Sequence, residues 1–193
     1  MEFDKILNEF FRNVKEKSID IYNEASLQCE LVLYIRSNIS KNFMVQVERN
    51  IDYFTFSNDF VKKEIDLVIY KEKKELENMC VIELKAPLNQ EHARPVTIYN
   101  WIIDLKFLEQ LQNKGITNCY SIFITDHKGY FYGKRAGKLL SDFRARKIHG
   151  QYKKQRNSSK LKEIINLTET YSFEWNDITR DIKYFLIKIS NCV

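Results

Sequence analysis

Apolar residues recur along this chain with two kinds of spacing, and each kind predicts a different secondary structure. Spacings of three and four residues predict amphipathic helices over residues 3–14, 20–39, 98–112 and 176–190. Alternating or continuous apolar runs predict strands over residues 43–48, 64–70, 79–87, 116–125 and 130–132, with 51–56 continuing the first of them after a bend at Asn50. The order of these elements predicts an α/β sandwich with a mixed central sheet flanked by helices.

Charged residues stand on two of these strands, which follow each other in the sequence. In the strand over 64–70, alternation puts Asp66 on the face opposite its apolar neighbours, and in the next strand it puts Glu83 and Lys85 on one shared face. The polar connection predicts a hairpin, which would make the strands antiparallel and set Asp66 beside Glu83 and Lys85. Such charges are costly to desolvate, so a divalent cation held by the carboxylates is the usual reason to keep them. The alternative is an exposed Glu–Lys pair on a half-wet sheet.

The acid-x-Lys spacing of Glu83 and Lys85 carries little information by itself. It occurs five times, at Glu72-Lys73-Lys74, Glu83-Leu84-Lys85, Asp104-Leu105-Lys106, Asp126-His127-Lys128 and Asp181-Ile182-Lys183. We set aside the triplets at Asp104 and Asp181, because they lie in predicted helices, where residues two apart do not face each other. The triplets at Glu72 and Asp126 fall in a polar turn and at the polar end of a strand. Only the Glu83 triplet lies inside an apolar strand beside a second acid-bearing strand.

The composition restricts the class of protein. With 193 residues, 44% of them hydrophobic, the chain is long enough for one domain with a real core. Its four cysteines are scattered without a C-x-x-C pair and it has only three histidines, so we expect no structural zinc site. The N-terminus lacks a signal-peptide pattern and no apolar run approaches about 18 residues, which predicts a cytoplasmic protein without a membrane span.

Basic residues concentrate in residues 134–162. Eleven bases stand there against the single acid Asp142, a net charge of +10, whereas the whole chain carries +5. This concentration suits a phosphodiester backbone, and a solubilising tail is the alternative. The expected nucleic-acid contacts are Arg144, Arg146, Lys147, Lys153 and Lys154, with His92 and Arg94 in the loop between the two prolines, for which a solvated surface loop is the alternative. We assign residues 1–133 to the core and 134–193 to a basic extension and closing helix of the same domain.

One combination of residues resembles a known family. Asp66 is followed, after sixteen intervening residues, by Glu83-Leu84-Lys85 on the next strand; a helix bearing Glu30 precedes them and the helix over 98–112 follows. This arrangement, over residues 20–133, resembles the PD-(D/E)xK nuclease superfamily, which has the restriction endonuclease-like fold. Ile65 precedes Asp66 where the literal motif has proline, a position that commonly varies in the superfamily.

The resemblance implies a role for each charged residue of the pattern. Asp66 and Glu83 would bind Mg²⁺, or Mn²⁺ in its place, together with the Leu84 carbonyl. Lys85 would orient the attacking water or help to deprotonate it, and Glu30 would be the helix carboxylate that reaches a metal or a metal-bound water. The alternative for Glu30 is that it flanks the apolar stripe of its helix and reaches water. Independently, hard carboxylate oxygens suit Mg²⁺, and an ammonium stabilises charge on phosphate.

Together these features lead to an expected function. The leading expectation is a metal-dependent DNA endonuclease of the type II restriction class that acts on duplex DNA without a nucleotide cofactor, because no nucleotide-binding glycine motif is present. A junction resolvase or an RNA-cleaving nuclease of the same fold is the first alternative. A non-catalytic nucleic-acid-binding protein is the second, and the complete set Asp66, Glu83 and Lys85 argues against it. The sequence leaves open a homodimer, the target and the cut position.

Overall fold

The structure is a computed structural model, and it describes residues 3–56, 59–73, 75–89, 93–133, 137–153 and 164–189. In this part of the chain the helices are α1 (Phe3–Lys15), α2 (Glu24–Asn38), α3 (Pro95–Asn113) and α4 (Lys138–Arg144). The strands are β1 (Phe43–Asn50), β2 (Glu64–Lys71), β3 (Cys80–Lys85), β4 (Asn118–Thr125), β5 (Lys147–Lys153), β6 (Ile164–Ser172), β7 (Asn176–Asp177) and β8 (Lys183–Ile189). Short 3-10 helices are η1 (Ile51–Phe54), η2 (Leu76–Asn78) and η3 (Lys128–Tyr130).

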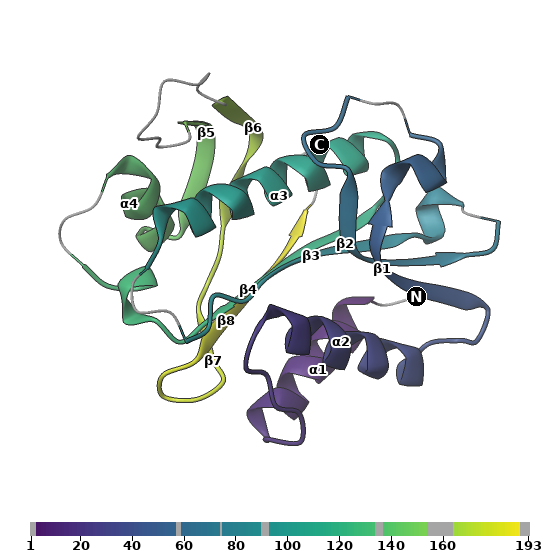
Figure 1. The fold of residues 1–193 in the computed structure, drawn as a ribbon, viewed down its shortest axis with the longest axis horizontal. Coiled ribbons are helices and arrows are strands. Elements are labelled where there is room, and N and C mark those ends of the chain that lie inside the picture. The colour runs from purple at the N-terminus through teal and green to yellow at the C-terminus, as the bar shows by residue number, and fades with distance from the viewer. Residues whose placement is uncertain are drawn as a thin grey trace.

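The architecture is α/β with a mixed sheet of six strands in the order β1-β2-β3-β4-β8-β7. β3 and β4 run parallel and are joined through α3, whereas the other neighbours are antiparallel. α1 and α2 lie on one side of the sheet and α3 on the other, with the separate β5–β6 sheet beside α3 (Figure 1). The predicted α/β class and mixed sheet are confirmed. The helices expected over 3–14 and 98–112 and the antiparallel hairpin of 64–70 with 79–87 are confirmed as α1, α3 and β2–β3.

Alternation along the central strands builds two apolar layers. Leu67 of β2 packs in the layer formed with α1 and α2, whereas Val68, the next residue, packs in the layer that contains Leu105 of α3. All three side chains are fully buried. By the same alternation, Asp66 points to the side of the sheet that α3 covers. The strand period therefore directs the charged residues toward α3.

α2 begins later than the predicted helix over 20–39. The Oδ1 of Asn23 accepts a hydrogen bond from the Ser26 N–H at 2.7 Å, and the Ser26 Oγ accepts one from the Asn23 N–H at 3.0 Å. This reciprocal cap satisfies N–H groups that the first helical turn leaves free, and it starts the helix at Glu24. Glu24 and Gln28, four residues apart, consequently lie on one face of the first turns.

The predicted closing helix over 176–190 is wrong. The chain forms the hairpin β7–β8 there, and β8 lies within the sheet, paired with β4 over seven residues. Phe185, Ile187 and Ile189 alternate as buried residues of this strand. The apolar residues upstream of them have helical spacing, but the segment forms a strand because the backbone groups of β4 would otherwise be left unpaired inside the sheet.

Two further strand predictions are wrong for local reasons. The expected continuation after Asn50 is η1 instead, because the Asn50 side chain accepts a hydrogen bond from the Asp52 N–H at 2.8 Å and closes a turn. The strand expected at 130–132 is replaced by η3, where the Nδ1 of His127 accepts a hydrogen bond from the Gly129 N–H at 3.0 Å. Both segments remain in turns that polar side chains stabilise.

Part of the basic segment 134–162 is regular, since α4 and β5 come from it. β5 pairs with β6, and β6 is attached to α3 by a buried carboxylate. Glu109 of α3 accepts hydrogen bonds from the backbone N–H groups of Thr168 and Glu169 and from the Tyr171 hydroxyl, each at 3.0 Å. Among the helices described above, none has the length and hydrophobicity needed to cross a membrane.

Candidate active site

The carboxylates of Asp66 and Glu83 lie together where the pairing of β2 with β3 ends. The recorded pairs run as far as Leu67 and Ile82. Beyond them the Leu84 N–H donates to Asp66 Oδ2 at 2.8 Å, and the Asp66 N–H lies 3.3 Å from Glu83 Oε1. Each carboxylate is therefore fixed by the backbone of the opposite strand. Asp66 is 9% exposed and Glu83 only 1%, which excludes an exposed pair on a half-wet sheet.

A lysine that the sequence analysis missed lies among these carboxylates. The Nζ of Lys62 is 2.6 Å from Asp66 Oδ1 and forms a short hydrogen bond with Glu83. It also lies 3.3 Å from Oδ1 of Asp104, which projects from α3 and is 4% exposed. Three carboxylate oxygens from β2, β3 and α3 thus surround one ammonium.

Lys85 occupies the other side of Asp104. Its Nζ lies 2.9 Å from Asp104 Oδ2 and donates a hydrogen bond to the Leu84 carbonyl oxygen at 2.8 Å. Glu24, at the start of α2, is within 4.0 Å of the same ammonium. Asp104 therefore bridges two lysines, and the expected grouping of Asp66, Glu83 and Lys85 is present in the structure.

The start of α2 closes the site from the opposite side of the sheet. Glu24 Oε2 accepts a hydrogen bond from the Ala86 N–H at 2.9 Å, and the Gln28 side chain donates to the Asp66 carbonyl oxygen at 3.0 Å. Glu30 follows Glu24 by six residues, which turns it by about 240° around the helix. Among the described residues, Glu30 makes no hydrogen bond or ion pair with this cluster. The helix carboxylate beside Lys85 is thus Glu24, and the expectation for Glu30 is corrected.

Asp104 also corrects the sequence analysis, which set its triplet aside. The geometric reason was sound, because Lys106 turns away from Asp104 and binds Glu109 Oε2 at 2.9 Å. The signal that could have identified Asp104 is its position next to the buried Leu105, on the apolar side of α3. Lys62 has no such signal, since it precedes β2 in an irregular segment.

Burial and neighbouring charges shift the pKa values of the carboxylates in opposite directions. Burial, followed by the negative charges of Asp66 and Asp104, raises the pKa of Glu83 well above its ordinary value. Burial alone would raise the pKa of Asp66 too, but the ammoniums of Lys62 and Lys85 and the Leu84 N–H hold it below its ordinary value. For Asp104, burial outweighs both lysines and raises the pKa.

The two lysines remain ammoniums in this cluster. Burial would lower the pKa of Lys62, but the charges of Glu83, Asp104 and Asp66 raise it. Burial likewise acts against the charge of Lys85, whose pKa Asp104, Asp66 and Glu24 raise. Four carboxylates face two ammoniums, a formal charge of −2 when all six groups are ionised. The site therefore favours a further positive charge.

The donor set suits a hard divalent cation. Oδ1 of Asp66, Oε2 of Glu83 and Oδ1 of Asp104 all approach a single point, where the Lys62 ammonium lies. Oxygen ligands of this kind are those that Mg²⁺ and Mn²⁺ prefer. In the described part of the chain, no group of three or more Asp, Glu, His or Cys side chains forms a ready-made metal site. The Leu84 carbonyl, expected as a metal ligand, accepts its hydrogen bond from Lys85.

Comparison of the chain with protein families, curated proteins and solved structures finds no match. The resemblance to the PD-(D/E)xK superfamily therefore rests on this chain alone. It consists of the order α2-β1-β2-β3-α3-β4 and of the acidic and basic groups gathered at the end of β2 and β3.

Arg144, one of the expected nucleic-acid contacts, binds the protein backbone in the structure. Its Nε and Nη2 donate to the Gly129 carbonyl oxygen at 3.0 and 2.7 Å. Gly133, with a φ of +141°, packs so closely against it that a Cβ would lie 2.7 Å from the guanidinium. Arg144 therefore fastens α4 to the turn at η3 through Nε and Nη2.

The other expected nucleic-acid contacts are on the surface where the structure describes them. Arg146 forms an ion pair with Glu174. Lys147 and Lys153 are exposed at the two ends of β5, and Arg94 is exposed immediately before α3. Two expected contacts lie outside the described residues, His92 and Lys154.

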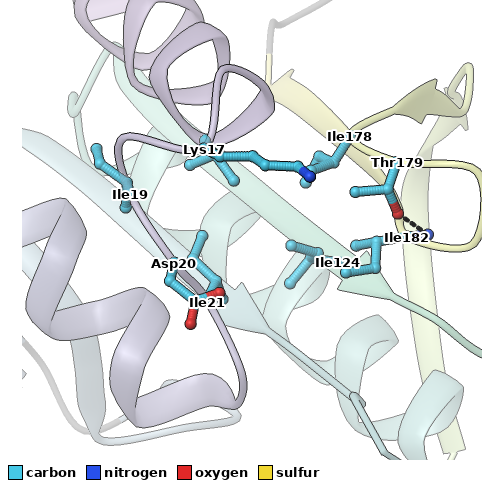
Figure 2. A pocket seen from close by; sticks show the side chains of 9 residues that line it. Lys17, Ile19, Asp20, Ile21, Ile124, Ile178, Thr179 and Ile182 are labelled. Atoms are coloured by element: carbon cyan, nitrogen blue, oxygen red, sulfur yellow. Dashed lines mark hydrogen bonds between the residues drawn. The ribbon is translucent and has the colours of Figure 1, made fainter.

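A separate cavity of about 300 Å³ lies between the α1–α2 connection, the end of β4 and the β7–β8 turn. Figure 2 shows that isoleucines form most of its lining and that Lys17 extends across it toward Ile178. Asp20 is the acid in the lining. One lysine and one aspartate among isoleucines supply no set of ligands comparable with the cluster around Lys62.

Proposed function

We propose that this chain is a metal-dependent nuclease that hydrolyses phosphodiester bonds of duplex DNA, with a restriction endonuclease-like fold. The observation that carries the proposal is the buried grouping of Asp66, Glu83 and Lys85 at the end of two adjacent strands. Burying such a group of charges costs stability, and buried charges with shifted pKa values are typical of functional sites. The order of helices and strands around it supports the same proposal.

Asp66 and Glu83 would hold the metal, and Asp104 adds a third carboxylate on the same point. When bound, a divalent cation supplies positive charge that stabilises the oxygens of the phosphate in the transition state. Leu84 contributes through its backbone, since its N–H keeps one Asp66 oxygen in place. The backbone contacts of both carboxylates fix the ligands before any metal arrives, which reduces the entropy lost on binding.

Lys85 would act through its charge. Its raised pKa keeps it protonated at neutral pH, so the ammonium can orient the nucleophile and stabilise charge on the phosphate, whereas it is a poor acceptor for a proton. Asp104 holds this ammonium in position at 2.9 Å. Glu24, with about half of its side chain exposed, forms the solvent-facing side of the cluster beside Lys85.

Plasmid cleavage tests the proposal. We expect supercoiled plasmid to be cut in Mg²⁺ or Mn²⁺ and to stay intact in EDTA. Asp66→Asn and Glu83→Gln should each lower the rate by at least about 100-fold, because lesser changes around metal ligands already have effects of 10–100-fold. Glu64→Gln, an exposed acid two residues before Asp66 on the same strand, is the matched control and should cut normally.

The products distinguish between substrate classes. Discrete fragments from duplex DNA support a restriction-type nuclease. Cleavage confined to four-way junctions or to RNA would mean that the same active site acts on those substrates instead. A wild-type protein that cuts none of the three in Mg²⁺ or Mn²⁺, yet binds duplex DNA, would overturn the nuclease proposal in favour of a binding protein.

A further inference from the structure

Lys62 occupies the centre of the carboxylate cluster. Its ammonium contacts Asp66, Glu83 and Asp104, which come from three different elements, and its side chain is 22% exposed. A metal that binds these three oxygens, at about 2.1 Å, on the side that they turn toward the ammonium would take the place of the nitrogen. The ammonium and a metal therefore cannot occupy this point together.

The segment that carries Lys62 is held in place from two sides. The Gln110 side chain of α3 accepts a hydrogen bond from the Val61 N–H at 2.9 Å and donates one to the Asp59 carbonyl oxygen at 2.8 Å. On the other flank, the Ile51 N–H donates to the Lys63 carbonyl oxygen at 2.9 Å. The backbone before and after Lys62 is thus fixed, and these hydrogen bonds hold the ammonium beside the carboxylates.

The Lys62 ammonium also balances charge that the fold would otherwise bury uncompensated. Glu83 and Asp104 are 1% and 4% exposed, so their negative charges would repel each other with little solvent screening. Lys85 contacts Asp104 but makes no recorded ion pair with Glu83 in the described part of the chain. Among the residues that the structure describes, Lys62 is the cation in direct contact with Glu83.

We propose that Lys62 is the resident counter-cation of this site and that a divalent metal binds by displacing its ammonium. The inference rests on the proposed function, because it assumes that these carboxylates bind a metal. Exchange of the ammonium for a metal ion has two linked consequences. Lys62 stabilises the metal-free protein, and it weakens metal binding, since every bound metal must first break three ammonium–carboxylate contacts.

Calorimetric titration with Mn²⁺, together with thermal melting in EDTA and in Mn²⁺, tests the exchange. Lys62→Met keeps the aliphatic length and removes the charge. We expect it to bind Mn²⁺ at least about tenfold more tightly than wild type, since close charge pairs carry coupling of this size or more. Its melting temperature in EDTA should fall, and the rise on adding Mn²⁺ should exceed that of wild type. Lys63→Met, the exposed neighbour, should match wild type in both measurements.

A second pair of variants tests the exchange without removing the lysine. Gln110→Ala releases the Val61 and Asp59 contacts, so we expect its Mn²⁺ affinity to rise above wild type, though less than that of Lys62→Met. Gln112→Ala is the matched control, because Gln112 lies on the same helix and donates to the Ile189 carbonyl oxygen, away from the site. Should Lys62→Met not fold in EDTA, an unchanged affinity of Gln110→Ala would still overturn the exchange.

The outcomes separate this inference from the proposed function. In one outcome, wild type binds Mn²⁺, Asp66→Asn does not, and Lys62→Met binds it no more tightly than wild type. That outcome overturns the exchange and supports the metal site. No Mn²⁺ binding by wild type or by Lys62→Met overturns both. Tighter binding in Lys62→Met with normal binding in Lys63→Met supports both.

Discussion

The Nζ of Lys85 lies 2.9 Å from Oδ2 of Asp104, an ion pair that joins β3 to α3 across the candidate active site. Lys85 belongs to the strand pair that the sequence already singles out, whereas Asp104 comes from the helix that follows. Because Asp104 is 4% exposed, solvent screens this pair little, and the lysine is both held in place and kept protonated. Asp104 therefore positions Lys85 through Oδ2, while its Oδ1 faces the cluster around Lys62.

A double-mutant cycle tests that relationship. We expect Lys85→Met to cut DNA about 10²–10³-fold more slowly than wild type, the usual loss for one electrostatic donor, and to bind DNA in Ca²⁺ nearly normally. Asp104→Asn should slow cleavage about 10–100-fold by releasing the lysine. If Asp104 acts through Lys85, the double variant should be little slower than Lys85→Met alone. Rate losses that multiply would instead show independent roles, and Asp52→Asn, an exposed acid, is the control.

The opposite pKa shifts of Glu83 and Asp66 predict opposite dependences of stability on pH. In EDTA, the native state holds the Glu83 proton more tightly than the unfolded state does, so its contribution declines as pH rises above the ordinary value of 4.5. Glu83→Gln, which has no proton to lose, should therefore gain stability relative to wild type as pH rises. The gain should reach up to about 1.4 kcal/mol per pH unit until the folded-state pKa is passed.

Asp66 provides the contrast. Its lowered pKa means that its contribution is complete above the ordinary value of 3.8 and is lost as pH falls through the folded-state pKa. Asp66→Asn should then be less stable than wild type by a constant amount near neutral pH. Urea unfolding of the three proteins between pH 5 and pH 8, a range of about three units, measures both trends. A stability difference between Glu83→Gln and wild type that does not change with pH would contradict the assigned shift.

The part of the site that the sequence could predict lies on two neighbouring strands, β2 and β3. Alternation fixes the faces of Asp66 and Glu83, and one polar connection fixes their pairing, so local rules suffice. Asp104 enters the site through the docking of α3, and the helical period shows only that it lies on the apolar side of that helix. Lys62 enters through an irregular segment, which no period describes. Glu24, and not Glu30, lies beside Lys85 because the first turn of α2, which begins at the cap of Asn23, is the part of the helix that meets the end of β3.

The fold, like the site, was predicted where local patterns decide it and not where distant contacts do. The apolar pattern identified α1, α3 and the central strands, each of which carries buried side chains at its apolar positions. It failed at β8, where helical spacing around Ile178 and Ile182 coexists with strand alternation from Phe185 onward. The outcome depends on β4, some sixty residues upstream, whose edge β8 completes.

Glu109 predicts a stability effect outside the candidate active site. Burial would raise the pKa of this carboxyl, but Lys106 and the N–H groups of Glu169 and Thr168 hold it low, so it is charged and accepts strong hydrogen bonds. Glu109→Gln should reduce the free energy of unfolding by about 1.5–3 kcal/mol, the range for hydrogen bonds to a charged group. Urea titration at neutral pH measures the loss, with the exposed Glu77→Gln as the control. An equal midpoint for both variants would show that β6 is held by its apolar contacts alone.

We expect the exposed lysines of β5 and the hydrogen-bonded Arg144 of α4 to affect DNA binding differently. Lys147 and Lys153 are exposed on β5, in the small sheet beside α3, whereas Arg144 donates two hydrogen bonds to the Gly129 carbonyl oxygen. A phosphate contact releases counterions and contributes about 0.9 to the slope of log affinity against log salt. The two lysines should therefore change the salt dependence, and the arginine should change stability.

Replacing both Lys147 and Lys153 with Ala should flatten that slope by up to about 1.8 units if each contacts one phosphate of duplex DNA. Fluorescence anisotropy in Ca²⁺ at several salt concentrations measures it. The control removes the same charge from the opposite side of the sheet: Lys5→Ala with Lys15→Ala, two exposed residues of α1, should leave the slope unchanged. Arg144→Met should lower the melting temperature and leave the slope unchanged, because its guanidinium binds a carbonyl oxygen. Equal flattening by the β5 and α1 pairs would mean that net charge alone attracts the DNA, and a slope reduced by Arg144→Met would return that arginine to the interface.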